Sequence, residues 1–89
     1  MAVRQLILTT TVGPTTLQRV VATCARRSCA ITALRWEQRG GVGRLSLEVS
    51  GARYHVERLG RWLGTLVDVL EVVDAEPVPG GSDVAVRPA

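Results

Sequence analysis

The chain has 89 residues, of which 46% are hydrophobic and 21% are charged, a balance typical of one small globular domain. The net charge is +3, and all eleven basic residues are arginines spread from Arg4 to Arg87 without forming a stripe, which argues against nucleic-acid binding. Cys24, Cys29 and His55 are too few ligands for a structural zinc site, so we expect no metal. No apolar run is long enough to span a bilayer, and the first residues do not resemble a secretory signal. We therefore expect a cytoplasmic protein without membrane contact.

The first predicted elements are a strand and a helix. Residues 4–11 are rich in Leu, Ile and Thr and are followed by Gly13 and Pro14, which indicates a strand that ends at a turn. Pro14 suits the first turn of a helix, and apolar residues then recur at helical spacing until residues 27–28. This apolar stripe consists of Leu17, Val20, Val21 and Cys24. It predicts a buried thiol at Cys24 in place of a redox site.

A hairpin is predicted next. Residues 30–39 carry Ile31, Leu34 and Trp36, and the glycines of residues 40–43 supply the positive backbone angles of a tight reversal. In the return strand, residues 44–50, apolar and polar side chains alternate strictly. The apolar members are Leu45, Leu47 and Val49. We therefore expect a sheet with one buried face and one face in contact with water.

The second half adds a helix and a strand. Residues 52–64 place Val56, Leu59 and Leu63 on one side of a predicted helix. The β-branched run 66–74 predicts the fourth strand, with Asp68 exposed on the open face of the sheet.

The remaining residues, 75–89, contain three of the four prolines and too few apolar side chains to form a core, so we expect a mobile tail after a domain of residues 1–74. The order strand-helix-strand-strand-helix-strand, with right-handed crossovers, predicts an α+β ferredoxin-like βαββαβ sandwich. Its antiparallel sheet has the strand order 4-1-3-2, with both helices on one face. The second and fourth strands form exposed edges that offer backbone groups to a partner.

Two segments carry a family resemblance. Residues 58–74, RLGRWLGTLVDVLEVVD, resemble the second helix and fourth strand of acetolactate synthase (acetohydroxyacid synthase) small subunits, where a helix ending in leucine is followed by Leu-Val-Asp-Val. Residues 13–20, GPTTLQRV, are similar to the turn and first helix of the short, single-domain members. The resemblance covers about residues 4–74, and its most specific part is the run at residues 66–69.

The resemblance implies an ACT domain that is not itself an enzyme. It implies a regulatory subunit that binds the catalytic subunit of acetolactate synthase in branched-chain amino-acid biosynthesis and raises its activity. Thiamine diphosphate, Mg and FAD would belong to that catalytic subunit, with no cofactor in this chain. Because so small a domain gains stability from a partner and its edge strands offer unpaired backbone groups, we also expect a homodimer, with an interface along the second strand at Ile31, Ala33, Arg35 and Trp36.

The effector site implied by the resemblance departs from the family pattern. Valine-sensitive members have Asn and Gly in the loop after the first strand and Asn at the start of the second strand; these positions are Val12, Thr15 and Ala30 here. Each hydrogen bond to a charged end of an amino acid is worth about 1.5 to 3 kcal/mol. We therefore expect weak or absent valine feedback. The expected effector-binding residues are Val12, Gly13, Pro14, Thr15, Thr16 and Ala30, and the alternative explanation for the start of this helix is a plain cap without a ligand.

Three functional hypotheses remain at this point. The first is the acetolactate synthase regulatory subunit, and the alternative is a free-standing ACT-type amino-acid sensor that regulates another protein. An RNA-binding ferredoxin-like module is disfavoured because the inner strand 44–50 has no aromatic side chain to stack on bases. Glu37, His55 and Asp68 lack a second group at a spacing suited to acid-base or nucleophilic work, so we predict no catalytic residue. Trp62 fits a core position and an interface position equally well.

Overall fold

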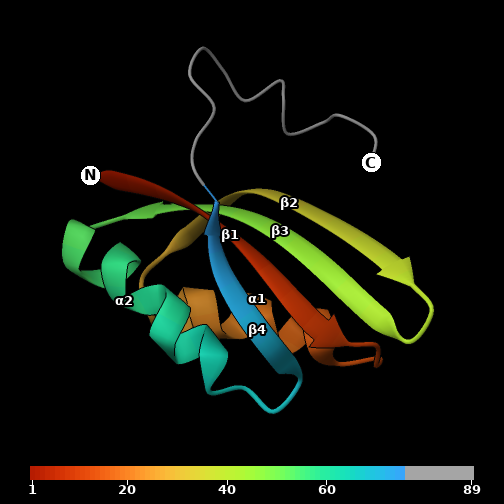
Figure 1. Ribbon diagram of the computed structural model, residues 1–89. Coiled ribbons are helices and arrows are strands. Elements are labelled where there is room, and N and C mark those ends of the chain that lie inside the picture. The colour runs from red at the N-terminus through yellow and green to blue at the C-terminus, as the bar shows by residue number, and fades with distance from the viewer. Residues whose placement is uncertain (76–89) are drawn as a thin grey trace.

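The computed structural model describes residues 1–75, in which a four-stranded antiparallel sheet is covered on one face by two helices (Figure 1). The elements are β1 (Ala2–Thr11), α1 (Thr16–Arg26), β2 (Ala30–Arg39), β3 (Val42–Gly51), α2 (Arg53–Gly64) and β4 (Val69–Ala75). The strand order β2-β3-β1-β4 is the predicted order counted from the other edge. The predicted ferredoxin-like sandwich is therefore confirmed. The expected tail falls outside the described residues except for Ala75, which belongs to β4.

The core lies between the helices and the apolar face of the two central strands. Leu6 and Leu8 of β1 are in register with Leu47 and Leu45 of β3, and all four are almost completely buried. The predicted alternation in β3 is thus confirmed. The helices complete the core with five buried apolar side chains: Val20, Cys24, Val56, Leu59 and Leu63.

The buried stripe of α1 differs from the predicted one at a single turn. Val21, which was predicted to be buried, is 42% exposed, whereas Thr23, which was not, is buried. The Thr23 hydroxyl donates a hydrogen bond to the carbonyl oxygen of Arg19 at 2.8 Å, which offsets the cost of burying it. The thiol of Cys24 is buried as predicted, and this burial, with a smaller contribution from Cys29, raises its pKa to about 11. Cys24 therefore stays protonated at neutral pH.

The β2–β3 hairpin needs its glycines for two different reasons. Of the glycines in residues 40–43, all of which the structure describes, only Gly40 has a positive φ, +59°. The prediction that the whole segment supplies such angles is wrong, because Gly43 already belongs to β3. A β-carbon at Gly43 would overlap the ring of Trp36 and would lie 2.7 Å from the hydroxyl oxygen of Thr10. Gly43 therefore makes room for the tryptophan.

The beginning of β4 also differs from the prediction. The strand starts at Val69, and the preceding residues form a turn after α2. In this turn the amide of Leu66 donates to the carbonyl oxygen of Leu63 at 3.1 Å, and the amide of Val69 donates to that of Leu66 at 3.0 Å. The carbonyl oxygens of Leu63, in α2, and of Leu66, after it, thus bind amides that a strand would have paired with β1. As a consequence, Asp68 lies in the turn and not on the open sheet face.

Arg4 of β1 connects three elements. Its Nε and Nη2 contact Oδ1 of Asp74 in β4 at 2.7 and 2.6 Å. Its Nη1 donates to the carbonyl oxygens of Val56 and Glu57 in α2, both at 2.8 Å. The hydrogen bond from the guanidinium lowers the pKa of the Asp74 carboxyl below its ordinary value.

This contact predicts an acid-sensitive contribution to stability. Because the pKa of Asp74 is lower in the folded protein than in the unfolded chain, the contribution is present above about pH 4 and is lost as the pH falls through the folded-state pKa. Asp74 is 64% exposed, so solvent screening limits the effect to about 1 kcal/mol. We expect Asp74→Asn to be less stable than the wild type at neutral pH and equally stable in strong acid, as measured by urea denaturation. Glu71→Gln in the same strand is the control, and an unchanged pH profile of Asp74→Asn would contradict the prediction.

Candidate functional site

The β1–α1 loop, residues 12–15, joins the end of β1 to the start of α1 at the hairpin end of the sheet (Figure 1). All four loop residues are exposed, whereas Thr16 is buried. The amide of Thr16 donates to the carbonyl oxygen of Gly13 at 3.4 Å, and the first helical hydrogen bond runs from Arg19 to Thr15 at 3.0 Å. The N-cap residue, Thr15, makes no side-chain hydrogen bond to the helix. Amides at the start of α1 are therefore available to a carboxylate, which fits the predicted effector loop.

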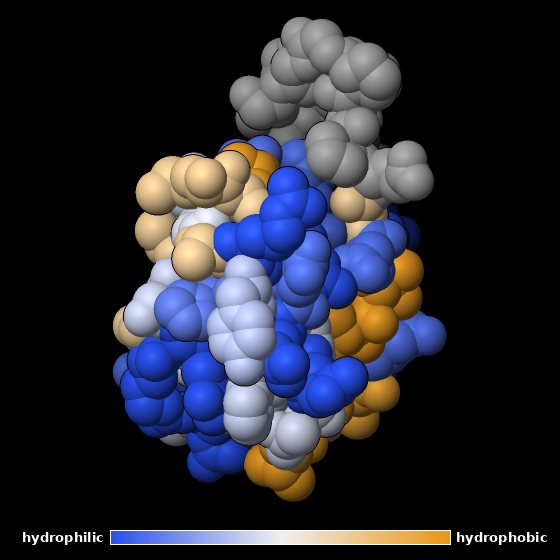
Figure 2. All heavy atoms as spheres, turned by 90° about the vertical axis from the view of Figure 1, so that its left-hand side faces the viewer, coloured by the Kyte–Doolittle hydropathy of each residue, from blue (hydrophilic) through white to orange (hydrophobic). Residues whose placement is uncertain are grey.

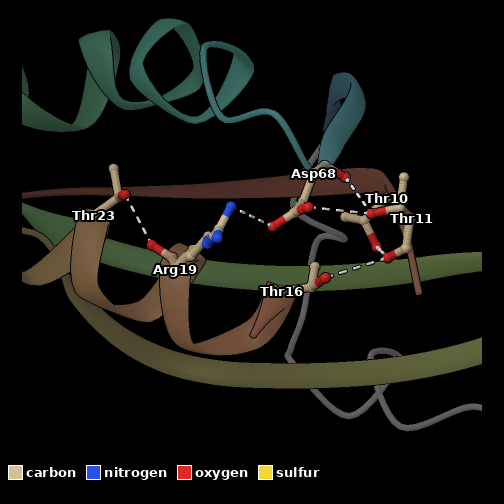
Figure 3. Close-up of polar contacts among 6 residues, drawn as sticks. All are labelled: Thr10, Thr11, Thr16, Arg19, Thr23 and Asp68. Carbon is tan, nitrogen blue, oxygen red and sulfur yellow. Dashed lines mark hydrogen bonds and ion pairs between the residues drawn. The ribbon is translucent and has the colours of Figure 1, made fainter. Parts of the chain in front are cut away.

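A polar cluster lies beneath this loop and consists of Thr10, Thr11, Thr16, Arg19 and Asp68 (Figure 3). The amide of Thr11 donates to the carbonyl oxygen of Asp68 at 2.8 Å, and the Thr11 hydroxyl lies 3.4 Å from Oδ1 of Asp68. The hydroxyls of Thr16 and Thr10 both donate to the carbonyl oxygen of Thr11, at 3.5 and 2.9 Å. The polar cluster thus joins the end of β1, the first turn of α1 and the turn before β4.

Arg19 completes the polar cluster through an ion pair with Asp68. Its Nη1 lies 3.1 Å from Oδ2 of Asp68, and the Asp68 side chain is only 22% exposed. This Oδ2 atom is buried and receives no well-aligned hydrogen bond, so the charge of Arg19 is what offsets its burial. Arg19 is not recognisable from the sequence, because the helical pattern places it on the polar side of α1 and gives no signal of its partner.

The ion pair predicts unequal effects for its two members. Arg19→Met should lower the free energy of unfolding by about 1 to 2 kcal/mol, because it leaves a mostly buried carboxylate without a counter-charge. Asp68→Asn should lower the free energy of unfolding by less, since a neutral side chain at this position needs no counter-charge. Urea denaturation measures both, with the exposed Arg61→Met on α2 as the control. A loss in Arg19→Met no larger than in the control would contradict this account.

Ala30 lies far from the other residues of the predicted effector site. It pairs with Ser50 at one end of β3, whereas the loop follows Thr11, which pairs with Val42 at the other end. Eight residues of β3 separate these positions, roughly 26 Å at about 3.3 Å per residue. Within one chain the structure therefore brings the loop residues together but leaves Ala30 apart from them.

The predicted interface residues lie on the edge strand β2, which pairs with β3 on one side. Ile31 and Trp36 are in register with Val49 and Leu45 on the helix-covered face, whereas Ala33 and Arg35 are in register with Glu48 and Ser46 on the open face. The predicted residues thus form a continuous edge that includes both faces. Leu34, which was not among the predicted interface residues, is 43% exposed on the same edge.

The residues considered for catalysis do not form a common site. Glu37 lies in β2, His55 in α2, and Asp68 in the turn before β4. His55 packs edge-on against Tyr54, with 5.7 Å between ring centroids. Among residues 1–75, no three His, Cys, Asp or Glu side chains are grouped closely enough to hold a metal ion. Neither helix in this part of the chain has the length and apolar composition needed to cross a membrane.

Comparison with known proteins identifies the fold. No protein-family model matches the sequence, and no curated protein matches it. The ACT domain from GTP pyrophosphokinase of Chlorobium tepidum is similar in structure, with a TM-score of 0.69, 9% identity, and coverage of 82% of this chain and 96% of that one. The C-terminal domain of the MgtC protein from Mycobacterium tuberculosis matches with a TM-score of 0.62 and 17% identity, over 82% of this chain and 84% of that one.

The small subunit of acetolactate synthase from Thermotoga maritima is also similar, with a TM-score of 0.76 and 22% identity. The match covers 89% of this chain and 50% of that chain, so this protein spans half the length of that subunit. The chain therefore has the fold of ACT domains, and an acetolactate synthase small subunit is among the proteins that share it.

Proposed function

We propose that this chain is a regulatory subunit that binds the catalytic subunit of acetolactate synthase and raises its activity. One observation carries the proposal: the two segments that resemble small subunits of this enzyme, residues 13–20 and 66–69, meet in the polar cluster. Thr11 and Asp68 are 57 positions apart in the sequence, yet their backbones and side chains are hydrogen-bonded. The structural similarity to the Thermotoga maritima subunit supports the same assignment.

The polar cluster gives a physical route for regulation. A ligand or partner that contacts the β1–α1 loop acts on Thr16, whose hydroxyl is hydrogen-bonded to the carbonyl oxygen of Thr11, and Thr11 is in turn hydrogen-bonded to Asp68. A shift in the loop would therefore displace the turn before β4 as well. Coupling between two sites in a protein typically amounts to about 1 to 3 kcal/mol, which corresponds to roughly 5- to 150-fold in affinity.

Two copies are needed to complete the proposed effector site. If β2 pairs antiparallel with β2 of a second copy, the start of one strand lies beside the end of the other. Ala30 of a second copy would then approach the end of the sheet where the loop lies. Val12, Thr15 and Ala30 offer no amide side chains there, so the proposed valine feedback is weak or absent.

Reconstitution tests the proposal. Adding the purified chain to the acetolactate synthase catalytic subunit of the same organism should increase acetolactate formation, and the two proteins should elute together in gel filtration. Asp68→Asn should stimulate less than the control Glu71→Gln, because only the former disturbs the polar cluster. Absence of both stimulation and co-elution would refute the assignment.

A free-standing amino-acid sensor is the second candidate, and the uncapped, solvent-facing start of α1 favours it. Calorimetric titration with the twenty amino acids separates the two functions. Saturable binding of one amino acid, without association with the catalytic subunit, would support the sensor.

A further inference from the structure

A small pocket lies between the end of α1 and the side of α2, away from the effector loop. Its volume is about 230 Å³, and its lining includes Arg26, Arg27, Ser28, Tyr54, Arg58 and Trp62. The eleven residues of α1 separate it from the loop by roughly 16 Å along the helix. The pocket is therefore distinct from the polar cluster and from the proposed regulatory site.

Aromatic rings hold two of the pocket arginines. The guanidinium carbon of Arg27 lies 3.4 Å from the ring centroid of Trp62, and that of Arg58 lies 4.4 Å from the ring centroid of Tyr54. An arginine stacked on a ring keeps its N–H donors free to bind an oxyanion in the plane of the guanidinium. Trp62 is thus not a core residue: it is partly exposed, and its ring stacks against the guanidinium group of Arg27.

No acidic side chain of the described residues neutralises the charges of the pocket arginines. Within residues 1–75, neither Arg26, Arg27 nor Arg58 forms an ion pair with a carboxylate. Arg26 donates a long hydrogen bond to the Thr23 hydroxyl, at 3.4 Å. Three adjacent cations that find no counter-charge in this part of the chain repel one another, so an anion between them would be stabilised.

The surrounding helices increase this positive potential. Residues 16–27 and 53–64 contain six arginines and a single acidic residue, Glu57. Glu57 is 3.8 Å from Arg53 and is not part of the pocket lining. The start of α2 has neither a side-chain cap nor an acidic residue in its first turn, and Tyr54 and His55 of that turn line the pocket, so the positive end of the helix dipole lies beside it. Figure 2, which shows the end of the molecule where α2 begins, displays mainly hydrophilic side chains there.

We propose that this pocket binds a small phosphate oxyanion, of which inorganic diphosphate is the best match. A phosphate group carries up to two negative charges and three free oxygens, enough for several guanidinium groups, whereas a carboxylate carries one charge and two oxygens. A volume of about 230 Å³ accommodates a diphosphate and is smaller than the pockets that enclose larger organic ligands. The binding site is independent of which enzyme the domain regulates.

Calorimetric titration of inorganic diphosphate into the full chain, at constant ionic strength, tests this proposal. We expect saturable binding that weakens at least about tenfold in Arg27→Gln and in Arg58→Gln, because each removes a charge-assisted contact. Arg53→Gln is the matched control: it removes the same charge from the same helix but lies outside the pocket, so it should bind as the wild type does. Arg58→Lys keeps the charge and loses the planar guanidinium, and it should bind with intermediate affinity. Circular dichroism confirms that each variant is folded.

Three results would overturn the proposal. The first is no saturable binding of diphosphate at millimolar concentration by the folded wild type. The second is equal weakening in Arg53→Gln and Arg58→Gln, which would mean diffuse electrostatic attraction without a site. The third is tighter binding of a glutamate-rich peptide than of diphosphate, which would identify the region as a docking surface for an acidic protein segment.

Discussion

Replacing Gly43 with alanine is expected to lower the free energy of unfolding by about 1 to 3 kcal/mol, as inserted atoms do in a well-packed core. Gly43 is a buried position of β3 between the Trp36 ring and the Thr10 hydroxyl. The new methyl group overlaps the ring, so Trp36 must leave its place and expose apolar surface. Thermal or urea denaturation of Gly43→Ala measures the loss.

Gly41→Ala is the matched control for this substitution. It introduces the same methyl group in the same hairpin, but no atom lies within 4 Å of the added carbon and the backbone needs no positive φ. We therefore expect little change. A double-mutant cycle with Trp36→Ala should show coupling of about 1 kcal/mol or more, because truncating the ring removes most of the clash. Equal destabilisation in Gly41→Ala and Gly43→Ala would show that backbone entropy, and not the tryptophan, explains the glycine.

The architecture could be predicted because it depends on local repeats in the sequence. Leu45, Leu47 and Val49 alternate with polar residues, so their strand has one buried face whatever it pairs with. Val56 and Leu59 recur at helical spacing and predict which side of α2 meets the sheet. Given these elements, the handedness of the crossovers leaves one strand order, which is the observed one.

Features that depend on distant contacts could not be predicted in the same way. β-Branched residues such as Val67 fit a strand or the turn that the structure shows, and the outcome depends on which carbonyls bind the neighbouring amides. Asp68 was predicted to be an exposed strand residue because nothing near it in the sequence indicates its ion pair with Arg19. The arginines of the two helices also looked scattered along the chain. The packing of α1 beside α2 is what gathers Arg26, Arg27 and Arg58 around one pocket.

Leu34→Glu is expected to weaken self-association of the chain by about 30-fold or more, the effect of losing an interface residue worth about 2 kcal/mol. Leu34 is 43% exposed on the edge strand β2, where the proposed dimer forms. In an antiparallel pair of β2 strands the new carboxylate lies near its symmetry mate, so repulsion adds to the lost apolar contact. Sedimentation velocity over a range of concentrations measures the change.

The control for this experiment is a substitution on β4, at the opposite edge of the sheet. Leu70→Glu makes the same substitution on β4 at a side chain that is 60% exposed, and it should leave the dimer intact. A wild type that stays monomeric at every concentration, or equal dissociation in both variants, would contradict a dimer through β2. Because Ala30 and the β1–α1 loop lie at opposite ends of the sheet within one chain, they can share a ligand only across such a pair. Leu34→Glu should therefore abolish any amino-acid response together with the dimer, whereas Leu70→Glu should retain both.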